Sequence, residues 1–174
     1  MKRGILLFSI LVFHFSCVFA QQRVIDSLYT VLKSGTQDTG RVNSLNILGR
    51  KLFIRGKYKA ADSMLKEAIK LSHTLSFKKG EGEAYRNIGA LNGAQGNYPE
   101  ALKAENEALK IFTEIGYKKG IGGVYGNLGL IYERQGNYPE AIKAQSEAIK
   151  IENNSIPLFI VVRLKKVNIK GKPI

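Results

Sequence analysis

Apolar residues recur at helical spacing along this chain, and the pattern returns every forty residues. Apolar or small residues fall three or four positions apart between Gly82 and Gln95, and the same spacing returns between Gly122 and Gln135. Each of these segments is followed by another, ending near Ile115 and Glu152, in which the apolar residues form one stripe. Because such a stripe buries one face of a helix, each forty-residue unit is predicted to be a pair of helices.

A short block between the two helices of a unit marks the repeat. Residues 96–101 read Gly-Asn-Tyr-Pro-Glu-Ala, residues 136–141 are identical to them, and residues 56–61 are a looser copy. Gly and Asn tolerate the positive φ at which helices end, and Pro is favoured in the first helical turn. A fixed period of this length predicts an all-α fold, an α-solenoid of antiparallel helix pairs.

The repeat also predicts where the segments of the chain begin and end. The predicted segments are a signal peptide at 1–20, a capping helix within 21–38 (Val24 to Lys33), repeat units at 39–77, 78–117 and 118–155, and an atypical basic tail at 156–174. The tail begins with a β-prone apolar run where a fourth unit would start. It is interpreted as a truncated gene, a frameshifted end or a divergent cap.

Residues 1–20 have the anatomy of a secretory signal. Lys2 and Arg3 precede a short apolar run, and Ala20 supplies the small residue at the cleavage site. We therefore expect an exported protein, periplasmic or secreted after cleavage near Ala20. Retention as an anchor is disfavoured because the apolar run is short. Lipidation at Cys17 is the other alternative, and His14 fits that motif poorly.

Composition argues against catalysis, metal binding and nucleic-acid binding. The net charge of +13 is spread as mixed Lys and Glu along helices, apart from the basic tail, so no nucleic-acid partner is predicted. The single Cys lies in the signal segment, and His73 is the only His beyond it. Without a cluster of His, Cys or carboxylates, we expect no enzyme activity, no cofactor and no metal.

Two glycines are predicted to mark close helix crossings. Gly89 and Gly129 occupy equivalent places on the first helices of their units, and alanines of the second helices face them. A larger side chain at either glycine would force the paired helices apart, at a typical cost of about 1–3 kcal/mol.

Residues 39–152 resemble the tetratricopeptide repeat family. The third unit carries the family's residues at the family's offsets: Tyr125, Leu128, Gly129, Tyr132, Gly136, Tyr138, Ala141 and Ala148. The resemblance implies a right-handed superhelix whose first helices line a concave groove that binds a protein or peptide. Where the family has a large aromatic between the two alanines, this chain has Leu65, Glu105 and Gln145, and we expect that departure to weaken packing between units.

The forty-residue period and the Lys-Lys-Gly starts at 78–80 and 118–120 narrow the resemblance. They are similar to the long-repeat subclass of kinesin light chains and Pins-type polarity adaptors. They are also similar to exported N-terminal regions of bacterial sensor histidine kinases and adenylate cyclases, as are residues 25–28 and 42–45. The alternative function is therefore a truncated sensor region of a signal-transduction protein.

The predicted ligand is an extended peptide held in the groove. By the resemblance, Asn87 and Asn127 point into the groove, where an amide side chain can pair with a peptide backbone. Arginines near them would add charge-assisted contacts to acidic groups. The predicted peptide-binding set is Asn46, Arg50, Arg86, Asn87, Asn127 and Arg134. The competing interpretation is that the Asn residues are merely tolerated and the Arg residues solubilise the surface.

Two further expectations concern partners. The lysines of the chaperone-binding clamp are missing from the matching positions, so no chaperone C-terminus is predicted as ligand. An exposed last helix pair could stack on another copy, so self-association through the C-terminal repeat is the other predicted interaction.

Overall fold

The computed structural model describes residues 23, 25–33 and 35–153. The predicted signal peptide at 1–20, Cys17, Val24 and the tail at 156–174 lie outside the described residues. Residues 25–33 are helical and precede the array.

The array consists of helices of nearly equal length. They are α2 (Thr39–Ile54), α3 (Tyr58–Thr74), α4 (Lys78–Ala94), α5 (Tyr98–Glu114), α6 (Lys118–Arg134) and α7 (Tyr138–Asn153). The described residues include no strand, so the predicted all-α repeat fold is confirmed.

The starts predicted for two helices were wrong. The apolar pattern placed these helix starts at Gly82 and Gly122. In the structure, α4 begins at Lys78 and α6 at Lys118, one turn earlier. The first turn contains lysines and a glycine and therefore lacks the apolar stripe from which the boundary was predicted.

Every connection within the array turns the chain back in three residues. At the end of α4, Gly96 has φ 79°, its N–H donates to the Gly93 carbonyl at 3.3 Å, and the Asn97 N–H donates to the Asn92 carbonyl at 3.0 Å. This is a Schellman motif, and its left-handed residue explains the glycine in the repeated block. The same two bonds close α2, α3, α5 and α6. Consecutive helices are therefore antiparallel.

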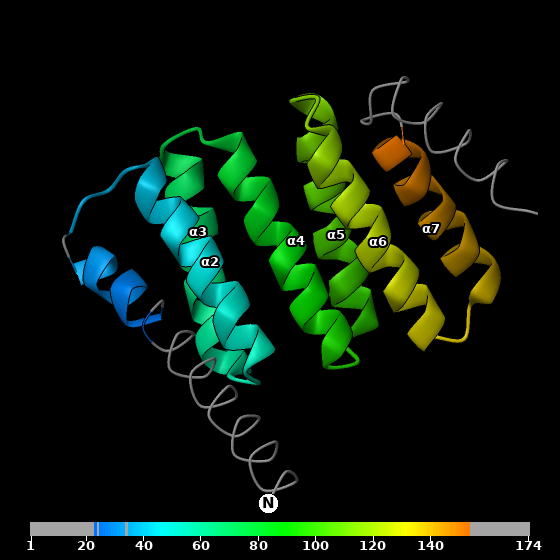
Figure 1. The fold of residues 1–174 in the computed structure, drawn as a ribbon, viewed down its shortest axis with the longest axis horizontal. Helices are drawn as coiled ribbons and strands as arrows, with labels where there is room; N and C mark the ends of the chain where they lie inside the picture. The colour runs from blue at the N-terminus through cyan, green and yellow to red at the C-terminus, as the bar shows by residue number, and fades with distance from the viewer. Residues whose placement is uncertain (1–22, 24, 34, 154–174) are drawn as a thin grey trace, which may run out of the picture.

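The helices form two layers. Figure 1 shows α2, α4 and α6 following one another along the array, and α2 contacts α4 as α4 contacts α6. Within units, α2 packs on α3, α4 on α5 and α6 on α7, while α3 contacts α4 and α5 contacts α6 between units. The first helices of the units thus form one continuous layer.

Buried residues run between the layers. The N-terminal cluster joins Leu48 and Leu52 of α2 to Leu65 of α3. In the other half, Phe112 of α5 packs with Val124 and Leu128 of α6. The core therefore continues across the unit boundaries, as a stacked array requires.

The helix at 25–33 packs on the first unit through the apolar side chains of Ile25, Leu28 and Leu32 and through a polar contact. Ile25 belongs to the N-terminal core cluster. The Arg41 guanidinium donates from Nη1 to the Leu32 carbonyl at 2.6 Å and pairs through Nη2 with Glu67 Oε1 at 2.7 Å. Arg41 therefore joins the N-terminal helix, α2 and α3.

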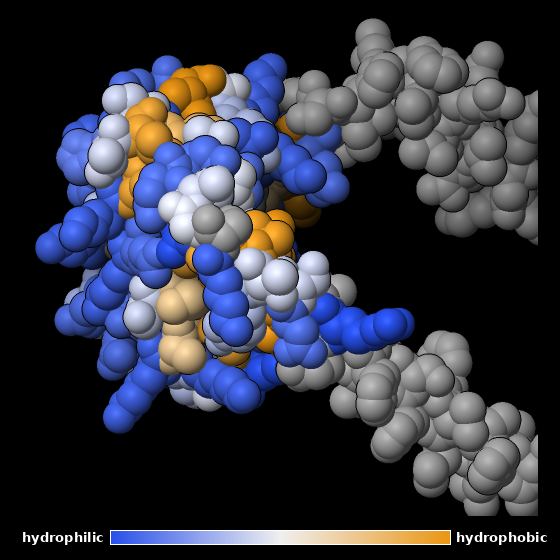
Figure 2. Space-filling model, turned by 90° about the vertical axis from the view of Figure 1, so that its left-hand side faces the viewer, coloured by the Kyte–Doolittle hydropathy of each residue, from blue (hydrophilic) through white to orange (hydrophobic). Residues whose placement is uncertain are grey.

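Large apolar side chains are exposed at both ends of the array. Figure 2 looks onto the N-terminal end, where hydrophilic side chains cover most of the surface and hydrophobic ones form separate patches. Ile54 of α2 is 69% exposed, and on α7 Tyr138, Ile142 and Ile149 are 63%, 66% and 58% exposed. No described helix combines the length and hydrophobicity needed to cross a membrane.

The predicted close crossings are confirmed. A Cβ built on Gly129 would lie 2.8 Å from the Gln145 side chain, and one on Gly49 would lie 2.7 Å from Leu65. On Gly89, the added Cβ would meet the carboxylate of Glu105. In each unit, the glycine at the crossing therefore lies directly against the residue between the two alanines of the second helix: Leu65, Glu105 or Gln145.

Candidate functional site: the groove lined by α2, α4 and α6

A pocket lies in the layer of first helices, where α4 and α6 meet. Its volume is about 190 Å³, and it opens to solvent. The wall contains apolar and small residues from three helices, together with one amide and one guanidinium: Phe53, Ala90, Gly93, Ala94, Asn127, Leu130, Ile131 and Arg134. Concave, largely apolar sites with a few polar groups are the usual form of a ligand site.

Arg134 forms the charged edge of this pocket. Its Nη1 donates to the Gly93 carbonyl at 3.2 Å, which joins the end of α6 to α4. The residue is exposed, and no carboxylate of the described residues forms an ion pair with it. Its guanidinium therefore retains donors that face solvent.

Asn127 supplies the amide of the pocket wall, and hydrogen bonds to two neighbouring helices hold its side chain. Its Nδ2 donates to Glu105 Oε1 at 2.8 Å and, at 3.5 Å, to the Arg86 carbonyl. Three helices contribute to this small network, because Asn127 lies on α6, Glu105 on α5 and Arg86 on α4. The Asn127 amide is therefore oriented by the junction of the second and third units.

Glu105 is an unusual residue for such a junction. Its side chain has 0% exposure, and its Oε2 has no hydrogen-bond partner. Burial raises the pKa of Glu105 from 4.5 to about 8, and the hydrogen bond from Asn127 and the charge of Arg86 only partly oppose this. At neutral pH the carboxyl is therefore largely protonated.

At position 105, replacement of the family's large aromatic was expected to weaken packing between units, but Glu105 is fully buried at this junction. As a neutral acid it fills the space above Gly89 and accepts a hydrogen bond from α6. Leu65 is likewise fully buried, whereas Gln145 is exposed.

The other predicted peptide-binding residues lie apart from the pocket. Asn46 is buried, and its Nδ2 donates to the Gly80 carbonyl of α4 at 2.9 Å. Asn87 is 8% exposed. Arg86 pairs with Glu83 at 2.6 Å on the same helix, and Arg50 is exposed on α2. The structure thus places Asn127 and Arg134 in one pocket, and a peptide-binding role for all six residues stays a prediction.

Sequence reasoning missed the apolar lining of the pocket. Leu130 is 54% exposed although it is apolar. Ala90 and Ala94 of α4 line the same pocket, and their small side chains leave space beside Leu130. The sequence did contain a signal for this pocket. Leu130 is apolar but lies outside the buried stripe of α6, and Ala90 and Ala94 of α4 are small.

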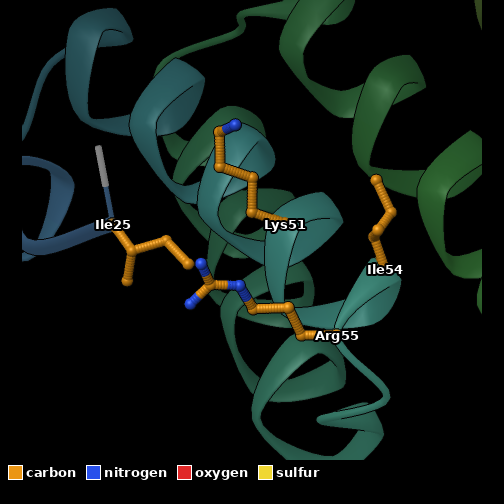
Figure 3. Close-up of a pocket in the computed structure, with 4 residues that line it drawn as sticks. All are labelled: Ile25, Lys51, Ile54 and Arg55. Atoms are coloured by element: carbon orange, nitrogen blue, oxygen red, sulfur yellow. The ribbon is translucent and has the colours of Figure 1, made fainter. Parts of the chain in front are cut away.

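A smaller cavity of about 90 Å³ lies at the N-terminal end of the array. Figure 3 shows Ile25 from the N-terminal helix facing Lys51 and Arg55 at the end of α2, with Ile54 pointing away from them. The cavity contains none of the predicted peptide-binding residues. Among the described residues, no group of His, Cys, Asp and Glu has the composition of a metal site.

Comparison with known proteins agrees with this architecture. The family model described as tetratricopeptide repeat matches residues 41–114 and 80–154, together more than half of the chain. The crystal structure of BtubC (BKLC) from P. vanneervenii aligns with a TM-score of 0.59 and 19% identity over 77% of this chain. This chain spans 55% of that protein's length.

The crystal structure of MamA aligns over 75% of this chain and 88% of that one, with 23% identity and a TM-score of 0.38. No curated protein matches the sequence. The helix pairs, the spacing of their turns and the family match lead to one conclusion: the chain belongs to the tetratricopeptide repeat family.

Proposed function

We propose that this protein is a non-enzymatic, exported scaffold that binds a protein or extended peptide in the groove lined by α2, α4 and α6. The observation that carries the proposal is the open pocket between α4 and α6, because it combines an exposed apolar wall with an amide and a guanidinium. Repeat proteins of this family generally present such surfaces to protein partners, which supports binding as the function.

A site-specific cross-linking experiment tests the groove. A photoreactive side chain replaces Leu130 in the pocket or, as a control, the exposed Lys103 on α5. Peptides selected from a random library on the folded protein are then irradiated with each variant. Cross-links at 130 and none at 103 support groove binding, and the reverse pattern would show that partners bind the other layer.

The export part of the proposal rests on the sequence of residues 1–20. Expression with the native N-terminus in a bacterial host should give a periplasmic protein that begins at Gln21. Mass spectrometry distinguishes this product from an uncleaved anchor and from a form lipidated at Cys17. A full-length cytoplasmic product would contradict export.

A sensor region of a signal-transduction protein is the alternative, and it rests on the resemblance of residues 25–28 and 42–45. The genomic sequence downstream decides between the two. An output domain in any frame would favour the sensor, and an unrelated gene would favour the scaffold.

Self-association through the last unit belongs to the same proposal. It is supported by the exposed apolar residues of α7. Light scattering after size exclusion should show a concentration-dependent mass that the substitution Ile142→Lys abolishes. A constant monomer mass at all concentrations would contradict it.

A further inference from the structure

We propose that a cavity at the C-terminal end of the array holds an aromatic side chain, Phe159, which the chain itself supplies from residues 156–162, outside the described residues. The cavity has a volume of about 460 Å³. Its wall is formed by the first turns of α6 and the last turns of α7: Lys118, Lys119, Gly122, Gly123, Ala148, Ile151 and Glu152. None of these residues lines the pocket between α4 and α6, so this inference is independent of binding in the groove.

The repeat shows which side chain this cavity suits. Glu152 stands forty residues after Phe112 of the second unit. Phe112 is fully buried and packs edge-on against Tyr117, with ring centroids 5.2 Å apart. A Cβ on Gly82 would lie 2.5 Å from the Phe112 ring, so this glycine makes room for the aromatic. The third unit keeps the corresponding glycine, Gly122, but has a carboxylate in place of the ring. The space for an aromatic side chain is therefore preserved while its source within the unit is lost.

The described residues leave this space open. A Cβ on Gly122 would lie 3.5 Å from Ile151, which is an ordinary van der Waals contact. Ile149 of α7 is 58% exposed, whereas Leu109, at the corresponding position of α5, packs against the core. An apolar face at this end of the array is therefore uncovered by the described part of the chain.

The segment 156–162 is the nearest source of a side chain for the cavity. Its sequence is Ile-Pro-Leu-Phe-Ile-Val-Val, which is apolar throughout and contains one aromatic residue, Phe159. An extended chain spans about 3.3 Å per residue, so the six residues that follow Asn153 can reach about 20 Å. The cavity wall includes Ile151 and Glu152 in the last turn of α7, so it lies well within that reach.

The start of this segment is unsuited to the turn that precedes each helix of the array. Gly116 has φ 66° in the turn between α5 and α6, and Ile156 stands forty residues later. A β-branched residue is an outlier at positive φ, and a residue before proline is biased towards extended conformations. Because Ile156 precedes Pro157, the chain is directed away from the Schellman turn and into an extended path across the end of the array.

Charge favours the apolar segment over the basic sequence that follows it. Lys118 and Lys119 at the cavity would repel the basic residues beyond position 162, whereas residues 156–162 carry no charge. Glu152 supplies a carboxylate to the same wall, and Arg163, directly after the apolar run, can pair with it. The chemistry of the wall therefore matches an apolar segment that ends in one arginine.

Photo-cross-linking tests where Phe159 lies. Benzoylphenylalanine, which is itself aromatic, replaces Phe159 in the purified protein with its native C-terminus, and mass spectrometry locates the cross-linked residues after irradiation. We expect cross-links within one chain, to residues 118–123 or 148–152. The control carries the same group at Ile169, in the basic tail, and should give no such cross-links. Cross-links from position 159 to another chain would overturn the inference, because a second copy would then occupy the cavity. Cross-links only to other parts of the chain, or none, would leave the cavity to an external partner and would also overturn it.

Thermal unfolding tests whether Phe159 fills the space that the aromatic ring fills in the second unit. Phe159→Ala should lower the midpoint by several degrees, while Ile169→Ala should leave it unchanged. Glu152→Phe restores the aromatic within the unit, so in that background Phe159→Ala should have little further effect. Equal shifts in the two backgrounds, or no shift in either, would contradict the inference. Glu152 is exposed, and the other two positions follow the array in sequence, so these variants remove nothing from the described core.

Discussion

The buried carboxyl of Glu105 should make the stability of the array depend on pH. The pKa of Glu105 is about 8 in the folded protein and 4.5 for an ordinary Glu, so between these values the folded state holds a proton that the unfolded state has released. Stability from this group is fully present below about pH 4.5 and is lost as pH rises towards 8. In that interval the free energy of unfolding falls by about 1.4 kcal/mol per pH unit.

Replacing Glu105 with Gln isolates this effect. Gln has a similar volume, stays neutral, and is the chain's own residue at the equivalent position 145. Near pH 5 the variant and the wild type should have similar stability, because the folded wild-type protein also has a neutral side chain there. From pH 5 to pH 7 the wild type should lose about 2–3 kcal/mol relative to the variant.

Urea unfolding followed by far-UV circular dichroism, at a series of pH values from 5 to 9, measures the difference. Glu107→Gln on the same helix is the control, because Glu107 is exposed and its removal should leave the pH profile of the wild type almost unchanged. Parallel profiles for the wild type and Glu105→Gln would refute the reasoning, since they would mean that Glu105 has the same pKa in both states.

Other substitutions test the packing of the backbone. Gly126→Ala should stabilise the protein by about 0.5–1 kcal/mol, because nothing lies within 4 Å of the added Cβ. Gly129→Ala should destabilise it by about 1–3 kcal/mol, because the added Cβ would contact the facing helix. Thermal melts compare the two variants. Ser76→Gly should stabilise by about 0.5–1 kcal/mol, since Ser76 has φ 52° where the other connections of the array have glycine, and an unchanged urea midpoint would contradict this. Asn46→Ala should cost about 1 kcal/mol by removing a buried hydrogen bond to α4, while Asn43→Ala at an exposed position of the same helix should be near neutral in the same urea experiment.

Much of the fold could be predicted because its determinants are local and repeated. The apolar spacing specifies helices, and the block at 96–101 specifies a turn that Gly96 realises with its positive φ. Gly89 and Gly129 lie at close crossings as expected, because only a residue without a Cβ fits there. The helices, the turns and the close crossings can therefore be predicted from the local sequence and the forty-residue period alone.

The site was harder to predict because it depends on contacts between units. A Glu within a helix is usually solvated, so the sequence gives no sign that Glu105 is buried. Its burial follows from its contacts with Gly89 of α4 and Asn127 of α6. Asn127 could be assigned to the first-helix layer from its position in the unit. Its orientation could not, since a residue 22 positions away holds its amide.

The even spacing of the turns has a consequence for how this chain can change in length. Helices α3 to α6 each contain 17 residues, and each is followed by a connection of three residues. A single inserted residue within a helix rotates everything beyond it by about 100° and turns the apolar stripe away from its neighbours. An insertion of one whole unit between equivalent turns preserves every stripe and adds one more pair of helices. Length variants of this array should therefore survive in steps of a complete unit, and intermediate lengths should be lost as misfolded chains.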